Sequence, residues 1–154
     1  MCIRDRIIPD LPTDSEDSFA LTQNLKLKSV PVVSVNSSFE RLTKLLNIPH
    51  SMVYLMSGTQ VTGKGLQANK NLSQQIKTIR KTSKSKLGVG FGIQSIKDLK
   101  WVLKRADIAI IGSAFIEARE QGDLENFSLA LKNVLDAENA PISILNNTKS
   151  RVHS

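Results

Sequence analysis

Short apolar runs alternate with amphipathic helical stretches along this chain of 154 residues. The apolar runs are Ile7 to Pro9, Val30 to Val35, Met52 to Met56, Leu87 to Val89 and Ile108 to Ile111. They are short and apolar along their whole length, which is typical of parallel strands covered on both faces. Strands that alternate with helices at this spacing predict five parallel βα units. The chain is therefore either a small complete α/β protein or the C-terminal part of a (β/α)8 barrel, which typically needs about 250 residues.

The stretches between the apolar runs have helical spacing and helix start signals. Asp14 and Ser15 open one helix that ends near Asn24, and Ser38 and Ser95 stand where N-caps are expected. The residues that recur on one face of each later stretch are Phe39, Leu42, Leu45 and Leu46; Leu72, Ile76 and Ile79; Ile96, Leu99, Val102 and Leu103; and Phe127, Ala130, Leu131 and Val134. A further helix is expected from Ala114 to about Glu120. Trp101 falls on one of the helices and is interpreted as a packing residue.

The composition excludes several classes of protein. With 40% hydrophobic and 23% charged residues, the chain has the balance of a soluble globular domain. It has no apolar run near the roughly 18 residues of a membrane span, and its first six residues lack a signal-peptide core. The single cysteine, Cys2, excludes an internal disulfide framework, and one cysteine with two scattered histidines predicts no structural zinc site and no metal ligand. We expect a cytoplasmic protein with no membrane partner.

A cluster of positive charge accounts for much of the net charge of +7. Its members, which fall in one ten-residue stretch, are Lys77, Arg80, Lys81, Lys84 and Lys86. They could form a nucleic-acid patch or the solvated face and end of a helix, where cations suit the helix dipole. The stretch has no interleaved aromatic residue and no recognised nucleic-acid motif. The sequence therefore favours the solvated helix and predicts no nucleic-acid partner.

Two glycine turns follow the last two apolar runs. They are Gly90-Phe91-Gly92-Ile93 and Ile110-Ile111-Gly112-Ser113-Ala114, and a helical stretch follows each. Glycine allows close approach of a ligand to the backbone, and N–H groups at a helix start bind anions. Two such turns on adjacent βα units are the layout of the phosphate cup after strands 7 and 8 of a (β/α)8 barrel.

Five short motifs together carry a family resemblance. In order, they are Ile8-Pro9-Asp10-Leu11-Pro12, Tyr54-Leu55-Met56-Ser57, Val61-Thr62-Gly63, Gly90-Phe91-Gly92-Ile93 and Ile111-Gly112-Ser113-Ala114. Each motif is weak alone, but their joint order and spacing, from about Ile7 to about Ala137, resembles the tryptophan synthase alpha chain. The resemblance implies the C-terminal five βα units of a (β/α)8 TIM barrel, incomplete as given. It also implies an enzyme that cleaves indole-3-glycerol phosphate into indole and glyceraldehyde 3-phosphate by a retro-aldol reaction.

The resemblance assigns the substrate phosphate to backbone N–H groups. Gly92, Gly112 and Ser113 would supply these groups, together with the Ser113 hydroxyl, and Gly63 would contribute from the loop after the third visible strand. A phosphate dianion needs convergent donors, and glycine leaves room for its oxygens.

The same resemblance assigns four further residues. Tyr54 and Phe91 would line the indole pocket, because flat apolar side chains suit an aromatic ring. Thr62 would lie in the loop that closes over the substrate. Asp10 would lie near the surface that meets the β subunit of an α2β2 assembly. The cofactor pyridoxal phosphate is expected in that β partner, and no cofactor is expected in this chain.

The resemblance also implies an absence. The two catalytic carboxylates of the family lie on the second barrel strand and the loop after it, whereas this chain is expected to begin at the fourth strand. We therefore assign no catalytic residue, and expect the chain as given to be inactive. Residues 1–6, with three charges before the Ile-Pro-Asp motif, are expected to be a non-native start, residues 7–140 a partial barrel domain, and residues 141–154 a frayed tail.

Two alternatives stay open at this point. The chain could be a non-catalytic half barrel that binds a phosphorylated ligand, which would need a partner to cover its open sheet edge. It could also belong to another family of phosphate-binding barrels, in histidine or indole biosynthesis. Those families share the phosphate cup but not usually the combination of Pro9-Asp10-Leu11-Pro12 with Val61-Thr62-Gly63.

Overall fold

The structure is a computed structural model, and it describes residues 5–6, 28–47, 50–58 and 70–138. The expected first strand at Ile7 to Pro9, the expected helix from Ser15 to Asn24 and the expected tail lie outside these residues. The boundaries expected for the three segments 1–6, 7–140 and 141–154 therefore stay predictions.

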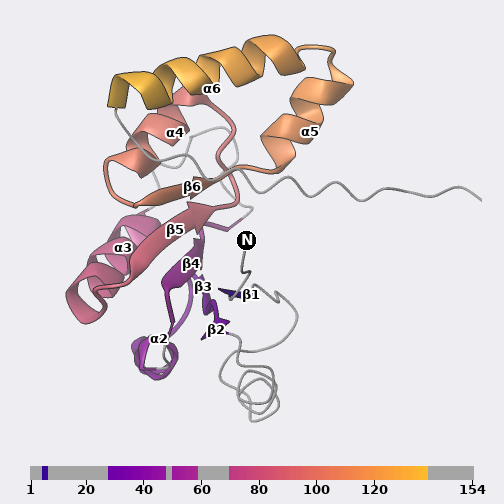
Figure 1. Cartoon of the computed structure of the whole chain (residues 1–154). Coiled ribbons are helices and arrows are strands. Elements are labelled where there is room, and N and C mark those ends of the chain that lie inside the picture. The colour runs from indigo at the N-terminus through magenta and orange to yellow at the C-terminus, as the bar shows by residue number, and fades with distance from the viewer. Residues whose placement is uncertain (1–4, 7–27, 48–49, 59–69, 139–154) are drawn as a thin grey trace, which may run out of the picture.

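The order of elements follows the predicted alternation (Figure 1). The strands are β1 (Asp5–Arg6), β2 (Lys28–Ser29), β3 (Val32–Ser34), β4 (Met52–Met56), β5 (Lys86–Gly90) and β6 (Ile108–Ile110). The helices are α2 (Phe39–Leu46), α3 (Lys70–Thr82), α4 (Ile96–Leu103), α5 (Ser113–Glu120) and α6 (Leu124–Glu138). The expected strands from Met52, Leu87 and Ile108 and the expected helices from Ser38 onward are therefore confirmed.

All strand pairs in the described residues are parallel. Strands β3, β4, β5 and β6 form a four-stranded sheet in chain order, and β1 pairs with β2. Parallel neighbours in sequence order are what successive βα units produce. The expected run from Val30 to Val35 contains β3, Val32 to Ser34, which pairs with β4, and the separate strand β2 at Lys28 and Ser29 precedes this run.

A short strand precedes the expected first strand. Strand β1 comprises Asp5 and Arg6, and it pairs in parallel with β2. The expected strand at Ile7 lies outside the described residues, so it stays a prediction.

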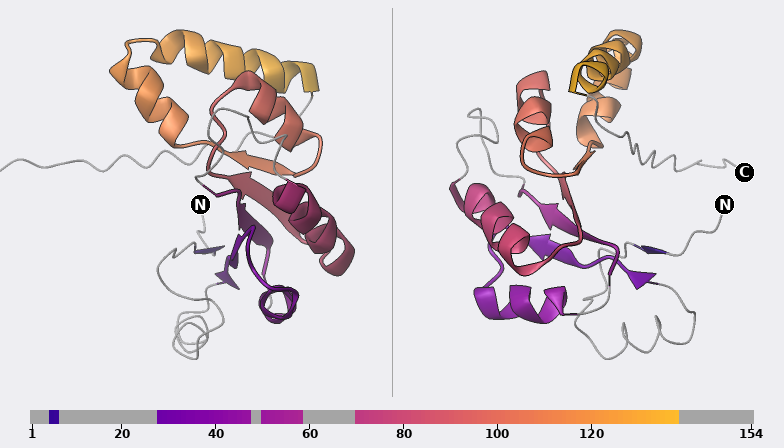
Figure 2. Two further views of the ribbon diagram at one scale, coloured as in Figure 1. Left: turned by 180° about the vertical axis from the view of Figure 1, so that it is seen from behind. Right: turned by 60° about the vertical axis from the view of Figure 1, so that its left-hand side comes forward.

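The hydrophobic core lies between one face of the sheet and the helices (Figure 2). Alternate strand residues, which share one face because the side-chain period of a strand is two, form its sheet side: Val33, Val53, Leu55, Leu87 and Val89. The helices contribute Leu42, Leu45 and Leu46, Leu72, Ile76 and Ile79, Leu99 and Val102, and Leu131 and Val134. Burial of these side chains is the main force that holds the helices on the sheet.

Two aromatic residues test the expected helix faces. Phe39 does not share the burial of its helix, because its side chain is 70% exposed while Leu42 is 1% exposed. Phe39 is the first residue of α2, and although its spacing puts it on the face of Leu42, Leu45 and Leu46, it is not buried with them. Trp101 packs against the core, and the Arg105 guanidinium lies 4.3 Å from its ring centroid. The interpretation of Trp101 as a packing residue is confirmed.

The predicted helix caps are present. The Ser38 hydroxyl accepts a hydrogen bond from the Arg41 N–H at 3.3 Å. Ser95 and Asp98 form a capping box, in which Ser95 Oγ accepts from Asp98 N–H at 3.2 Å and Asp98 Oδ2 accepts from Ser95 N–H at 3.1 Å. Each cap satisfies N–H groups that the first helical turn leaves without a partner.

An ion pair joins α3 to the loop before β6, at the end of the sheet where the strands begin. Arg80 Nη1 lies 2.8 Å from Asp107 Oδ2, which also accepts a hydrogen bond from Leu87 N–H at 2.7 Å. Burial acts to raise the pKa of Asp107, but the hydrogen bonds from Arg80 and Leu87 and the Arg80 charge together hold this pKa below its usual value. The pair fixes the start of β5 against its neighbours.

The part of the chain that the structure describes contains neither a membrane-spanning helix nor a cluster of metal ligands. No described helix is long and apolar enough to cross a membrane. Likewise, the described residues contain no group of three or more His, Cys, Asp or Glu side chains that could hold a metal ion.

Candidate functional site

The two glycine turns leave the sheet at the same edge. Gly90 is the register partner of Ile110, so each turn begins at the same level on one of two adjacent parallel strands. Gly92 lies two residues beyond Gly90, and Gly112 lies two residues beyond Ile110. Gly92, Gly112 and Ser113 are all exposed, as residues that contact a ligand from solvent must be. The fold therefore places on two adjacent strand ends the three described residues that the sequence predicts to bind phosphate, and this role stays a prediction.

The second turn ends at a helix N-terminus. Gly112 is the N-cap of α5 and Ser113 is its first residue, and the first turn of this eight-residue helix contains no acidic side chain. The first N–H groups of a helix lack partners within the helix and carry its positive partial charge. A Cβ atom placed on Gly112 would meet no atom within 4 Å, so the space above the turn is open. This arrangement can accept a phosphate group.

The first turn is held in place by Ser57, which follows β4. The Ser57 backbone N–H donates to the Gly90 carbonyl at 2.9 Å, and its hydroxyl donates to the same carbonyl at 3.0 Å. The Ser57 side chain is only 1% exposed. The sequence placed Ser57 in a motif but assigned it no role, because its partner lies 33 residues away.

An aromatic pair lies beside the first turn. The rings of Tyr54 and Phe91 are stacked, with centroids 6.3 Å apart and planes inclined by 22°. Tyr54 is 7% exposed and Phe91 is 47% exposed, so the pair has a buried and a solvent-facing member. Burial raises the pKa of the Tyr54 hydroxyl to about 12. The pair offers a flat apolar surface next to Gly92, although its assignment as an indole pocket stays a prediction.

The backbone of the first turn is left-handed at two successive residues. Phe91 has φ of 63° and Gly92 has φ of 81°. Glycine adopts this conformation readily, whereas a residue such as Phe91 does so at a cost of roughly 1 to 3 kcal/mol. Such strain persists where the surrounding structure holds it, which here includes the hydrogen bonds from Ser57 and the ring stack with Tyr54.

Three predicted site residues lie outside the described residues. They are Asp10, Thr62 and Gly63. Their assigned roles at the subunit surface, in loop closure and in phosphate binding stay predictions.

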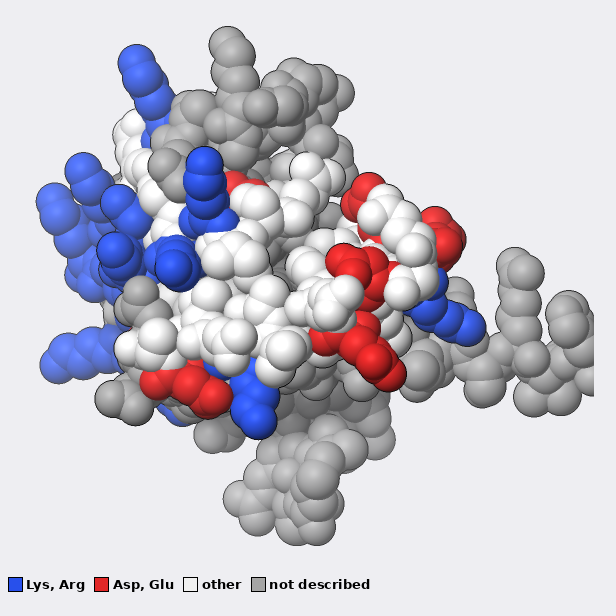
Figure 3. Space-filling view, turned by 90° about the horizontal axis from the view of Figure 1, so that it is seen from above, with Lys and Arg blue, Asp and Glu red and all other residues white. Residues whose placement is uncertain are grey.

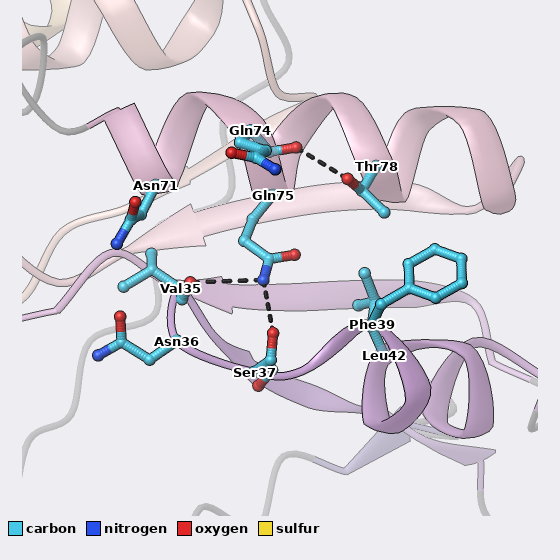
Figure 4. A pocket seen from close by; sticks show the side chains of 9 residues that line it. All are labelled: Val35, Asn36, Ser37, Phe39, Leu42, Asn71, Gln74, Gln75 and Thr78. Atoms are coloured by element: carbon cyan, nitrogen blue, oxygen red, sulfur yellow. Dashed lines mark hydrogen bonds between the residues drawn. The ribbon is translucent and has the colours of Figure 1, made fainter.

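The structure also contains a pocket that the sequence did not suggest, between α2 and α3 (Figure 4). Its volume is about 400 Å³, and it is lined by Val35, Asn36, Ser37, Phe39, Leu42, Asn71, Gln74, Gln75 and Thr78. Gln75 Nε2 donates to the carbonyls of Ser37 at 2.8 Å and Val35 at 3.4 Å, which ties α3 to the turn before α2. None of the predicted site residues lines this pocket, so it is distinct from the glycine turns.

Comparison with known proteins gives one consistent family. Residues 2–142 match the family model described as tryptophan synthase alpha chain. The chain is 32% identical over 141 residues to a tryptophan synthase alpha chain from Thermosynechococcus vestitus, covering 87% of this chain and 53% of that protein. It is 30% identical over 120 residues to one from Campylobacter jejuni, covering 77% of this chain and 48% of that protein. The chain thus spans about half the length of the curated relatives it matches.

Solved structures agree with this result. A tryptophan synthase alpha subunit from Campylobacter jejuni superposes with a TM-score of 0.66 at 27% identity, over 85% of this chain and 52% of that chain. A tryptophan synthase structure from Mycobacterium tuberculosis gives the same TM-score and identity, over 86% of this chain and 50% of that chain. A tryptophan synthase α2β2 complex from Pyrococcus furiosus gives a TM-score of 0.66 at 23% identity, which supports the fold alone. The predicted partial barrel is confirmed.

Proposed function

This chain belongs to the tryptophan synthase alpha chain family, and we propose that it forms the part of such an enzyme that holds the substrate by its phosphate. The substrate would be indole-3-glycerol phosphate, which the whole enzyme would cleave into indole and glyceraldehyde 3-phosphate.

One observation carries this proposal: the register of the two glycine turns. Gly90 pairs with Ile110, and the turn after each residue bears exposed backbone at Gly92 and at Gly112. N–H groups from two strands at one edge can converge on a single anion, which separate turns could not do. The helix that starts at Ser113 adds its positive end, with no acidic side chain in the first turn to oppose it.

The indole ring of the substrate is proposed to lie against Phe91. This residue is half exposed, directly precedes Gly92 and stacks on Tyr54. A substrate held by its phosphate at Gly92 would bring its aromatic end toward this pair. We further propose that Thr62 and Gly63 belong to the loop that closes over the bound substrate.

We propose that the catalytic step needs two carboxylates, and we assign neither of them to a residue of this chain. Retro-aldol cleavage in this family uses one carboxylate as general acid and base and a second that polarises the indole N–H. Loss of a general acid or base alone typically costs roughly 10² to 10⁴-fold in rate. We therefore expect the 154-residue chain by itself to release no measurable indole from indole-3-glycerol phosphate. Normal turnover in a steady-state indole assay would contradict this expectation.

The proposed partner of the whole alpha chain is a β subunit that carries pyridoxal phosphate. Support comes from the structurally similar Pyrococcus furiosus protein, which forms an α2β2 complex. We propose that Asp10 lies near the surface that would meet such a subunit.

The phosphate site can be tested with one charge at Gly112. An added Cβ at Gly112 meets nothing within 4 Å and its φ of −127° is not left-handed, and Gly112→Asp and Gly112→Asn place side chains of nearly equal size on the same backbone, so they form a matched pair that differs in charge. A carboxylate about 4 Å from the phosphate would cost between about 1 and 4 kcal/mol. At about 2 kcal/mol, Gly112→Asp should bind indole-3-glycerol phosphate about 30-fold more weakly in a calorimetric titration. The neutral Gly112→Asn variant should bind within a few-fold of wild type.

Equal binding by the Asp and Asn variants would show that no phosphate lies at this turn. A Gly112→Asp variant that fails to fold would be recognised by circular dichroism. In that case the Ser113→Ala variant, which removes one exposed hydroxyl, provides the same test with a smaller expected loss.

A further inference from the structure

Five exposed lysines form a basic surface at the end of the sheet where the strands begin. We define this basic surface as Lys77, Lys81, Lys84, Lys86 and Lys104. The first two belong to α3, Lys84 follows that helix, Lys86 begins β5, and Lys104 is the C-cap of α4. The sequence showed four of these residues as one stretch, but it did not show that the end of α4 would adjoin them.

The structure joins the ends of α3 and α4 through Arg80. Its Nη2 donates to the Arg105 carbonyl at 3.3 Å, and Arg105 directly follows Lys104. Lys77 and Lys81 are four residues apart, which places them on one side of α3, and Lys84 follows two residues after the helix ends at Thr82. Lysines from both helices therefore face solvent together, and Figure 3 shows Lys and Arg side chains gathered on one side of the molecule.

The positive charge of the basic surface has little compensation nearby. Asp98 and Asp107 are the only acidic residues between positions 70 and 107. Asp98 is 4% exposed within its capping box, and Asp107 is paired with Arg80. In Figure 3 most Asp and Glu side chains lie on the side of the view opposite the gathered Lys and Arg side chains, and one further acidic group lies beside them at the lower left. The positive charge of this view is therefore concentrated where the Lys and Arg side chains gather.

We propose that the basic surface binds the phosphate backbone of a nucleic acid without reading its sequence. Lysine ammonium groups are point charges that suit phosphates, and backbone contacts need no aromatic or base-reading side chain. This site lies on different residues from the glycine turns, so the proposal stands independently of the function proposed above. It departs from the expectation from the sequence that the basic stretch is a solvated helix with no nucleic-acid partner, and the experiment below decides between the two.

The composition of the basic surface disfavours a membrane as its partner. Helices that lie on membranes combine lysines with large apolar side chains that enter the lipid. The exposed large apolar residues of the described structure are Phe39, Phe91, Ile116, Leu124 and Leu129, and none of them lies on α3 or α4. An acidic protein is the remaining kind of partner, and the experiment below separates it from a nucleic acid.

The test measures binding of a fluorescein-labelled 20-nucleotide oligothymidylate by anisotropy between 50 and 200 mM KCl. For single strands, log K falls by about 0.7 per phosphate contact for each unit of log salt. Five contacts give a slope of about −3.5, which is a loss of about 130-fold over this range. The triple variant Lys77→Gln, Lys81→Gln, Lys84→Gln should retain a slope of about −1.4 and lose only about 7-fold.

A control variant removes the same charge elsewhere. Lys44, Arg119 and Lys132 are exposed and lie on α2, α5 and α6, helices that carry no residue of the basic surface. The triple variant Lys44→Gln, Arg119→Gln, Lys132→Gln should keep the slope of about −3.5. Both triple variants change only exposed residues to glutamine, which is a good helix former at the helical positions, so both should keep the wild-type melting curve.

Three outcomes would overturn the proposal. The first is that both triple variants lose the same slope, because binding would then follow net charge and not the basic surface. The second is that the wild-type chain shows no binding at 50 mM KCl. The third is that polyglutamate of equal charge competes as well as unlabelled oligothymidylate, which would make the basic surface a site for acidic proteins.

Discussion

Gly90 fills the narrowest space in the candidate site, and its substitution by alanine should destabilise the protein. A Cβ atom at this position would lie 2.6 Å from Tyr54 Oη, 2.8 Å from Tyr54 Cε2 and 3.0 Å from Ile110 Cβ. The Gly90 backbone is not left-handed, so the expected effect comes from the side-chain clash and not from backbone strain. Tyr54 is 7% exposed and can move aside only by disturbing its neighbours.

The expected cost can be estimated from these contacts. Forcing one extra carbon into a packed site typically costs about 1 to 3 kcal/mol. Displacing the Tyr54 ring also weakens its stack on Phe91, and such pairs contribute about 0.5 to 1.5 kcal/mol. We expect Gly90→Ala to lower the free energy of unfolding by about 2 to 3 kcal/mol, and the melting temperature by roughly 8 °C.

The assay is urea denaturation followed by circular dichroism, with the fluorescence of the single tryptophan as a second probe. Gly112→Ala is the matched control, since its added Cβ meets nothing, and should change stability by less than about 1 kcal/mol. In a Tyr54→Phe background, which removes the hydroxyl at 2.6 Å, the cost of Gly90→Ala should fall by about 1 kcal/mol. An unchanged cost in that background, or an equal cost at Gly112, would refute the steric explanation.

The remaining predictions concern titration and burial. Tyr54 is the single tyrosine of the chain, so the absorbance of tyrosinate should report its pKa of about 12, and a native midpoint near 10 would contradict its burial. Because the pKa of Tyr54 is raised on folding, the contribution of its neutral hydroxyl to the free energy of unfolding is fully present below pH 10. This contribution is lost as the pH rises from about 10 to 12. The lowered pKa of Asp107 acts in the opposite direction: its contribution is present above the unfolded value of about 3.8 and lost as the pH falls through the folded value. In the Asp107→Asn variant, the free energy of unfolding should fall less steeply as the pH is lowered below about 3.8. An unchanged dependence on acid pH would argue against the ion pair between Asp107 and Arg80. Finally, Phe39→Ser should change stability by less than about 0.5 kcal/mol while Leu42→Ala should cost about 2 to 5 kcal/mol, and a reversed order in the same urea assay would contradict their exposures of 70% and 1%.

Local patterns in the sequence were sufficient to predict most of the fold. Strand runs such as Met52 to Met56 and caps such as Ser38 and Ser95 depend on residues that are neighbours in the chain, and the structure confirms them. The exposure of Phe39 was not predictable from helical spacing, because the spacing fixes a direction around the helix and not how far the sheet extends beneath it.

Part of the candidate site could also be predicted from the sequence. The glycine turns are recognised by the types of neighbouring residues, and the register of β5 and β6 places the two turns side by side. Contacts between residues that are distant in the chain leave no such pattern in the sequence. The bonds from Ser57 to Gly90, from Arg80 to Asp107 and from Arg80 to Arg105 each depend on tertiary placement. For that reason the support of the first turn and the extent of the basic surface could be found only in the structure.

The most direct test of the central claim is whether one phosphorylated ligand contacts both glycine turns. The measurement is a titration of the isotopically labelled chain with indole-3-glycerol phosphate, followed through its backbone amide resonances. We expect the amide signals of Gly92, Gly112 and Ser113 to shift together with a single binding constant, because N–H groups bound to a phosphate change their environment at once. Shifts at only one of the two turns, or shifts of the two turns with different binding constants, would contradict a shared phosphate site.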